Sequence, residues 1–330
     1  MKKIYTHFLI LLIVSVLFSC KKEESNVPVV NTSGTNNPNQ PPSGSSATKL
    51  FTLDTAKIYQ YSINGTNEQT IVNRKIGNSS YINDLSLSAD GSEFVYIDVQ
   101  GASNGTVYIF THQIRIFDLE KSNDNSIYST TDAIIFVVKY CADGKIFFAT
   151  KNKLDNDIIK YYIINSDGTG LKESQGYFTN LVDITSSRRF MLLSIYTLGS
   201  PPSVSIVDST LDGGTGTYHS EFFSSSDFVY DGTFSPNGKK VVIPFLDGTD
   251  INIRIVDMDT KTATTRTIVS GVGQYSFAGI TIANDNNSVA LCVPGNQSKE
   301  KSKIYLFKLD DTAISSFDAK SWVVNKAYIY

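Results

Sequence analysis

One short unit recurs along the chain: an apolar strand, a turn that carries Asp-Gly or Asn-Gly, and a second apolar strand. Its two clearest copies, residues 84–96 and 231–243, align without a gap. Asp-Gly and Asn-Gly pairs tolerate the positive φ angles of a tight turn, so each copy predicts a β-hairpin. The residue that leads the turn is the reference position of the repeat, and it is occupied by Ser88, Cys141, Thr185, Ser235 and Ala283.

The spacing of the copies constrains the fold further. Successive reference positions are 53, 44, 50 and 48 residues apart, which is the spacing of four-stranded β-propeller blades. A third apolar strand follows the hairpins, at Ile159–Ile164, Val204–Val207, Ile251–Val256 and Lys303–Phe307. A β-sandwich or a barrel could carry similar hairpins, but several copies near one period favour the propeller.

Both ends of this region supply further strands. Lys57–Ile63 and Gln69–Val72 have the pattern of outer strands without an inner hairpin, and Trp322–Val324 and Ala327–Tyr330 are also strand-like. An apolar terminal strand needs a partner, because an open sheet edge exposes unpaired backbone groups. We therefore expect an all-β protein over residues 49–330, a six-bladed β-propeller of four-stranded blades with one blade closed by both termini.

Two of the turn segments resemble the repeats of TolB-like, WD-repeat-like β-propellers. Asn-Ser-Asp-Gly-Thr-Gly-Leu-Lys at 165–172 is similar to the outer half of such a repeat, and Phe-Ser-Pro-Asn-Gly at 234–238 is similar to the inner half. The resemblance runs from about residue 50 to the C-terminus and implies the propeller fold. Because the matching residues build turns, it implies nothing about a ligand.

The N-terminal residues have the order of a bacterial lipoprotein signal. Lys2 and Lys3 precede the apolar stretch Phe8–Leu17, which is too short to span a bilayer, since a membrane helix needs about 20 residues. The segment Leu-Phe-Ser-Cys that ends at Cys20 resembles the lipobox. We expect residues 1–19 to be a cleaved signal peptide and Cys20 to be the palmitoylated membrane anchor. An ordinary signal peptide with a stray cysteine is the alternative.

Residues 20–48 are rich in Ser, Asn, Pro, Gly and Thr. Such a composition buries too little apolar surface to offset its ordering entropy, so we expect a flexible tether. Its start, Lys-Lys-Glu-Glu at 21–24, resembles the surface-export signal of Bacteroidetes lipoproteins. The sequence thus predicts an outer-membrane lipoprotein. The propeller would lie either at the cell surface or on the periplasmic face of the membrane.

Charge and composition exclude some functions. Loss of Lys2 and Lys3 with the signal takes the formal net charge from −3 to −5, and no basic stripe is visible, which excludes nucleic acid as a partner. His112 and His219 have no second ligand at metal spacing, so we expect no metal and no cofactor. Cys141 and Cys292 lie in apolar runs of distant repeats and are expected to be buried thiols.

No catalytic motif stands out, and a Gly-x-Ser-x-Gly elbow is absent. The sequence therefore favours a non-enzymatic binding or scaffold module of the cell envelope, with a protein or a glycan as its partner. The alternative is a hydrolase or a lactonase-like enzyme that uses carboxylates at the mouth of the central channel.

The repeat alignment also suggests where a ligand would bind. Loops between the second and third strands of the blades lie on the face opposite the tight turns, and they occur at 100–105, 151–156, 197–202, 247–250 and 294–299. These loops look longer and more variable than the turns, so we expect the binding surface on their face. Asp84 and Asp231 occupy matching positions where the innermost strands begin, with Asp183 close by, and are the candidate ligand-binding residues. The alternative is that these carboxylates cap turns or face solvent.

Overall fold

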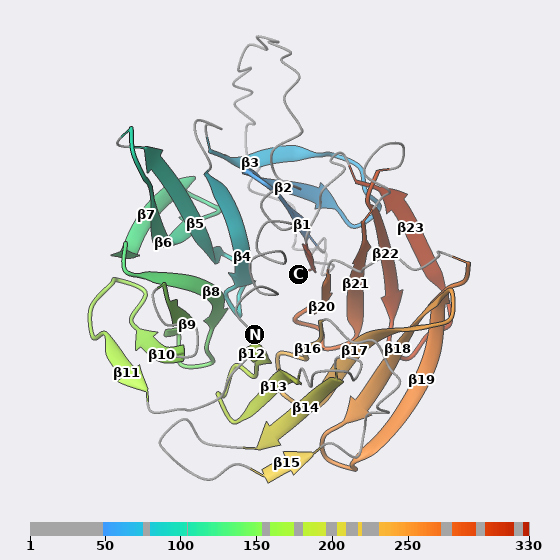
Figure 1. Cartoon of the computed structure of the whole chain (residues 1–330). Coiled ribbons are helices and arrows are strands. Elements are labelled where there is room, and N and C mark those ends of the chain that lie inside the picture. Colours follow the sequence, from blue (N-terminus) through green and yellow to red (C-terminus); the bar gives the residue numbers. More distant parts are fainter. Residues whose placement is uncertain are drawn as a thin grey trace, which may run out of the picture. The chain divides into compact units, whose positions relative to one another are not determined.

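The second strand of each repeat is apolar along most of its length, as in β17 (Lys240–Asp247), so both of its faces need to be covered. The structure, a computed structural model, meets this need with six four-stranded antiparallel sheets arranged as the blades of a β-propeller (Figure 1). It describes residues 49–74, 80–103, 105–153, 159–174, 181–195, 203–208, 217–219, 231–271, 279–294, 301–319 and 326–329. The predicted fold class is confirmed.

Five blades follow one another along the chain, each running from the innermost to the outermost strand. They comprise β4 (Tyr81–Leu87), β5 (Glu93–Ser103), β6 (Tyr108–Asp118) and β7 (Asn123–Thr130); β8 (Ala133–Tyr140), β9 (Ile146–Asn152), β10 (Ile159–Ile164) and β11 (Lys172–Ser174); β12 (Leu181–Ile184), β13 (Phe190–Ile195), β14 (Ser203–Asp208) and β15 (Thr217–His219); β16 (Thr233–Phe234), β17, β18 (Asp250–Asp257) and β19 (Thr262–Val269); β20 (Gly279–Ile282), β21 (Ser288–Val293), β22 (Lys303–Lys308) and β23 (Ile314–Asp318).

The sixth blade is built from both ends of the propeller, as predicted. Its order is β24 (Lys326–Ile329), β1 (Lys49–Asp54), β2 (Lys57–Ser62) and β3 (Gln69–Asn73). β1 lies between the C-terminal strand and β2, with Leu50 opposite Ile329 on one side and Tyr61 on the other. The strand-like segment at 322–324 lies outside the described residues.

The hydrophobic core is divided into six clusters, each formed where two neighbouring blades pack together. Between the blade β4–β7 and the blade β8–β11, for example, Val95 and Ile97 of β5 pack with Ile135 of β8 and Phe148 of β9. Cys141 and Cys292 belong to different clusters and are buried free thiols, as predicted. Burial raises the pKa of the Cys292 thiol to about 12.

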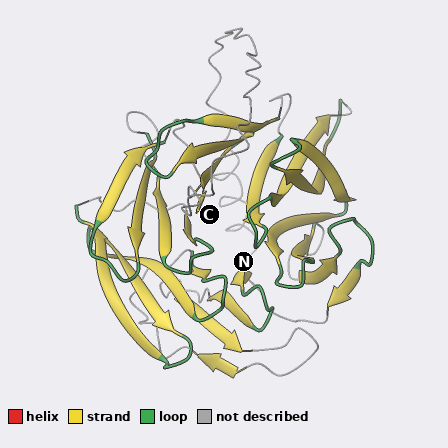
Figure 2. Ribbon diagram, turned by 180° about the vertical axis from the view of Figure 1, so that it is seen from behind, coloured by secondary structure: helices red, strands yellow, loops and turns green. Residues whose placement is uncertain are grey.

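The turns between the first and second strands share one backbone conformation. The residue three places after the reference position has a positive φ in all five copies: Gly91, Gly144, Arg188, Gly238 and Asn286. Strands and loops make up the whole described part of the chain (Figure 2). Within it, no helix is long and apolar enough to cross a membrane.

Candidate functional site

The innermost strands β4, β8, β12, β16, β20 and β24 are arranged around the centre of the ring (Figure 1), and residues from all six line a central channel. The channel holds a cavity of about 340 Å³ to which these strands contribute side chains. Each innermost strand contributes two to four consecutive residues to the lining, such as residues 84–87 of β4 and 137–140 of β8. The chemistry of the channel is therefore set by a few positions of the repeat.

One of these positions is polar in every copy of the repeat. Two residues before the reference position lie Ser86, Lys139, Asp183, Thr233 and Thr281, all of which line the cavity. Four of the five are buried and Lys139 is half-buried. A polar group in such a place is costly unless it is hydrogen-bonded, and each of these side chains has a partner.

Most of these partners belong to the next blade around the ring. Ser86 Oγ accepts a hydrogen bond from the Tyr140 N–H at 3.0 Å, and Asp183 Oδ2 accepts one from the Phe234 N–H at 2.9 Å. Both amides directly precede a reference position, so the same contact is repeated at two junctions. Thr281 Oγ1 donates to the Ala327 carbonyl at 2.6 Å.

Asp84 and Asp231 repeat a second contact. Asp84 Oδ2 accepts a hydrogen bond from the Val138 N–H at 3.0 Å, and Asp231 Oδ2 accepts one from the Ile280 N–H at 2.9 Å. The two aspartates stand four places before their reference positions, and the two amides stand three places before theirs. The matching positions seen in the sequence therefore have matching roles in the ring.

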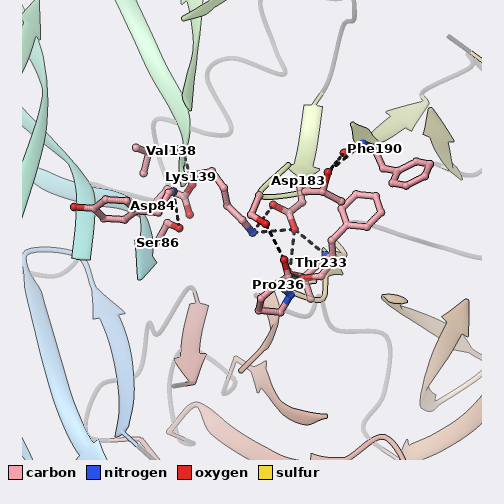
Figure 3. Close-up of polar contacts among 12 residues, drawn as sticks. Asp84, Ser86, Val138, Lys139, Asp183, Phe190, Thr233 and Pro236 are labelled. Atoms are coloured by element: carbon pink, nitrogen blue, oxygen red, sulfur yellow. Dashed lines mark hydrogen bonds and ion pairs between the residues drawn. The ribbon is translucent and has the colours of Figure 1, made fainter. Parts of the chain in front are cut away.

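Two further contacts complete the set. Lys139 Nζ lies 3.0 Å from Asp183 Oδ1 and joins β8 to β12, as Figure 3 shows. The Tyr328 hydroxyl donates to Asp84 Oδ1 at 2.7 Å and accepts from the Leu85 N–H at 3.0 Å, which joins the closing blade to β4. Each of the six junctions between blades is thus bridged by a side-chain hydrogen bond or ion pair near the channel.

The three predicted site residues occupy different surroundings. Asp84 and Asp183 line the cavity, and Asp183 is buried. Asp231 does not line it, but its charge acts on Tyr328: burial raises the pKa of this phenol well above its usual range, and Asp84 and Asp231 raise it further. Each of the three carboxylates accepts a hydrogen bond from a backbone amide of the neighbouring blade rather than capping a turn. Ligand binding by Asp84, Asp183 and Asp231 stays a prediction.

The described residues include no group of three or more His, Cys, Asp or Glu side chains that could hold a metal ion. His112 of β6 is buried, and its Nδ1 accepts a hydrogen bond from the Ile135 N–H at 3.3 Å. Burial and the nearby Lys153 ammonium lower the pKa of this imidazole to about 4. The side chain of His219 lies outside the described residues.

The face opposite the tight turns carries a projecting ribbon formed by β5 and β6. Of the segment 100–105, expected to be a loop, residues 100–103 instead continue β5, and Ser103 pairs with Tyr108 of β6. β4 accompanies β5 only as far as Val99, and β7 accompanies β6 only as far as His112. Beyond these residues, the part of the chain that the structure describes pairs only β5 with β6, and their cross-strand pairs continue to Ser103 and Tyr108.

Three consecutive hydrophobic side chains are exposed at the end of this ribbon: Val107, Tyr108 and Ile109, with 57%, 53% and 46% of their surface exposed. The rings of Tyr108 and Phe110 stack at a centroid distance of 6.4 Å. Of the other predicted loops on this face, 247–250 is a tight turn with Gly248 at a φ of +62°. The loops at 197–202 and 294–299 lie wholly or almost wholly outside the described residues, as does half of 151–156.

No protein-family model matches the chain, and no curated protein matches it in sequence. Solved structures share its fold. TolB from Acinetobacter baumannii has a TM-score of 0.62 at 15% identity, over 86% of this chain and 66% of the TolB chain. A chain of the nidogen/laminin complex has a TM-score of 0.60 at 11% identity, over 86% of this chain and 98% of that chain. At such identities the likeness shows the fold alone, a TolB-type six-bladed propeller.

Proposed function

We propose that this TolB-type propeller is a non-enzymatic binding module of the cell envelope, and that it docks a protein partner on the β5–β6 ribbon. The observation that carries the proposal is the exposure of three consecutive hydrophobic residues, Val107, Tyr108 and Ile109, at the end of the ribbon. Contiguous exposed apolar side chains commonly mark interaction sites, whereas single ones are ordinary.

The rest of the described surface supports this choice. The other large hydrophobic side chains that are exposed there, Ile63, Leu171 and Ile314, are each isolated in sequence. Among the described residues, no further strand pairs with β5 beyond Val99 or with β6 beyond His112 on the outer edges of the ribbon. An extended segment of a partner could add to such an edge, with the apolar side chains providing further contact.

The state of the channel carboxylates supports a binding role over the hydrolase or lactonase-like alternative. Asp84 accepts hydrogen bonds from Tyr328 and Val138, while Asp183 accepts from Lys139, Thr233 and Phe234. A general acid or base has to reach the substrate proton and change its own protonation state. Protonation of either carboxylate would disturb a junction between blades, which suits a structural role better than a catalytic one.

The anchor at Cys20 and the tether 20–48 complete the proposal. A lipid on Cys20 would keep the propeller at the outer membrane, at either the cell surface or the periplasmic face, while the tether gives it reach. Cys20→Ala should abolish incorporation of a labelled fatty acid and release the protein from the membrane fraction. Continued incorporation in this variant would contradict the assigned anchor.

Site-specific photocrosslinking in cells that express the full chain tests the docking site. A photoreactive phenylalanine at Tyr108 should give a discrete adduct, whereas the same group at Ile314, exposed on another blade, should not. The purified partner should then bind the wild-type protein and lose binding to the Tyr108→Asp/Ile109→Asp variant, with Leu171→Asp as the matched control. Equal adducts at both positions would argue against the ribbon as the docking site.

A separate assay tests the hydrolase or lactonase-like alternative. Turnover of glycan, ester or lactone substrates that is abolished by Asp84→Asn and by Asp183→Asn would favour an enzyme.

A further inference from the structure

The channel cavity has a mixed wall of charged, hydroxyl and aliphatic groups. Asp84, Lys139 and Asp183 are the charged residues among its described lining, beside aliphatic side chains such as Leu85, Val137 and Ile282. Its volume of about 340 Å³ lies at the lower end of the range for small-molecule sites. The cavity is therefore suited to one small molecule rather than to a folded partner.

Several polar groups of this wall keep unused hydrogen-bonding capacity. Lys139 Nζ carries three protons, and its recorded partners are the two oxygens of Asp183, at 3.0 and 3.3 Å. The Lys139 side chain keeps 23% of its surface exposed. Ser86 Oγ accepts from Tyr140, and its own proton has no acceptor among the described residues. Each oxygen of Asp84 accepts one hydrogen bond and can accept another.

These three groups are close in space. Figure 3 shows Asp84 and Ser86 beside the start of the Lys139 side chain, which reaches from there to Asp183. Ser86 and Asp84 lie on the same strand, β4, and both accept amides of β8, the strand that carries Lys139. A small ligand in the cavity could thus meet one cationic donor, one hydroxyl and one carboxylate acceptor at the same time.

The charge distribution restricts which ligand would fit. An anion would approach Lys139 but would also meet Asp84 and the buried Asp183. A cation would meet an ammonium that is already paired with Asp183. Either ion would lose its hydration shell while disturbing an existing pair, which is costly in a partly buried site. A neutral molecule that both donates and accepts hydrogen bonds avoids this cost.

We propose that the central channel binds a neutral, hydroxyl-rich ligand of monosaccharide size. Lys139 and Ser86 donate hydrogen bonds to its hydroxyl oxygens, and Asp84 accepts from its hydroxyl groups. The aliphatic side chains of Leu85, Val137 and Ile282 are available to the C–H faces of a sugar ring. The site uses residues distant in sequence from the β5–β6 ribbon and does not rest on the protein partner proposed above.

Saturation-transfer NMR with the full chain in detergent tests the proposal. The neutral probes are D-glucose, D-galactose and D-mannose, and D-galacturonate and D-galactosamine are the charged counterparts of galactose with the same ring. At least one neutral sugar should bind, and a charged counterpart should bind about tenfold more weakly or worse. Lys139→Met and Ser86→Ala should each weaken that binding by about tenfold.

Two controls separate binding from stability. Lys160→Met removes the partner of Glu173 in an exposed ion pair on the same blade as Lys139, and it should leave sugar binding unchanged. Ser86→Ala keeps the Lys139–Asp183 pair, so it stays informative if Lys139→Met does not fold. The proposal is overturned if no neutral sugar binds at about 10 mM, if a charged counterpart binds as well as galactose, or if Ser86→Ala and folded Lys139→Met bind like the wild type.

Discussion

At the scale of single residues, buried polar side chains hold neighbouring blades together. His112 is a clear case, because it is 2% exposed and its Nδ1 accepts the Ile135 amide of the next blade. Only the neutral imidazole can accept this hydrogen bond, and the depressed pKa keeps it neutral well below pH 7. Protonation of this imidazole at Nδ1 would therefore remove a hydrogen bond between β6 and β8.

We predict that this histidine makes the fold acid-sensitive. Its pKa is about 4 in the folded protein against 6.5 in the unfolded chain, so the unfolded chain binds more protons between these values. The free energy of unfolding should fall as pH drops from about 6.5 to about 4, by up to about 3 kcal/mol from this group. Urea titrations across this window should show a flatter pH dependence for His112→Asn than for the wild type. Parallel curves for the two proteins would contradict the prediction.

A second residue-scale prediction concerns Asp231, whose carboxylate satisfies the Ile280 amide. Asp231→Ala should lower the free energy of unfolding by about 1–3 kcal/mol, because a buried amide loses its acceptor. Asp231→Asn keeps an acceptor oxygen and should cost less. Denaturant midpoints of the two variants give the measurement, and an equal loss in both would mean that charge, rather than the hydrogen bond, matters at this junction.

At the scale of elements, the tight turns of the five hairpins share a left-handed residue regardless of its identity. Three copies use glycine, while Arg188 and Asn286 take φ angles of +61° and +60°. The packing of the strands imposes this conformation even where the side chain disfavours it. This explains why the two copies without glycine at this position, at 182–193 and 280–291, still form their hairpins.

Gly144→Ala isolates the backbone part of this effect. A Cβ atom added at Gly144 would meet nothing within 4 Å, so only the positive φ of +73° opposes it. We expect the free energy of unfolding to fall by about 1 kcal/mol. Gly101→Ala in β5, which has no positive φ, should not show this loss. Thermal unfolding of both variants tests the difference, and a Gly144→Ala protein as stable as the wild type would refute it.

The strands were largely predictable from local pattern, and the exceptions have physical causes. Tight turns and apolar runs are local signals, so the hairpins and third strands appear in the sequence. The segment 100–105 contains Gly101 and Gly105 and looks like a loop, yet β5 continues to Ser103 because cross-strand pairing outweighs weak propensity. The polar channel position is also occupied by Lys139, Thr233 and Thr281. Their role in joining blades depends on partners far away in the sequence, which a local pattern does not show.

At the scale of the whole molecule, the closing blade decides whether the ring is complete. Tyr328 of β24 bridges to β4 through Asp84 and the Leu85 amide. Tyr328→Phe should lower the free energy of unfolding by about 1–3 kcal/mol, since both partners lose a buried hydrogen bond. Tyr305→Phe is the matched control, because no hydrogen bond of its hydroxyl is recorded among the described residues. Urea unfolding measures the free energy of unfolding of both variants. An equal loss in both would show that the Tyr328 hydroxyl does not stabilise the closing blade.

The central position of β1 in the closing blade has a mechanical consequence. The segment before residue 49 is connected to the propeller through Lys49, the first residue of β1. β1 pairs with β24 on one side and with β2 on the other. A pull applied through the preceding segment therefore loads two rows of backbone hydrogen bonds at once, along the strand, instead of unzipping them singly. We expect single-molecule force spectroscopy to record a higher rupture force for this direction than for a pull on the outer strand β3. A lower force through β1 would show that this blade yields first.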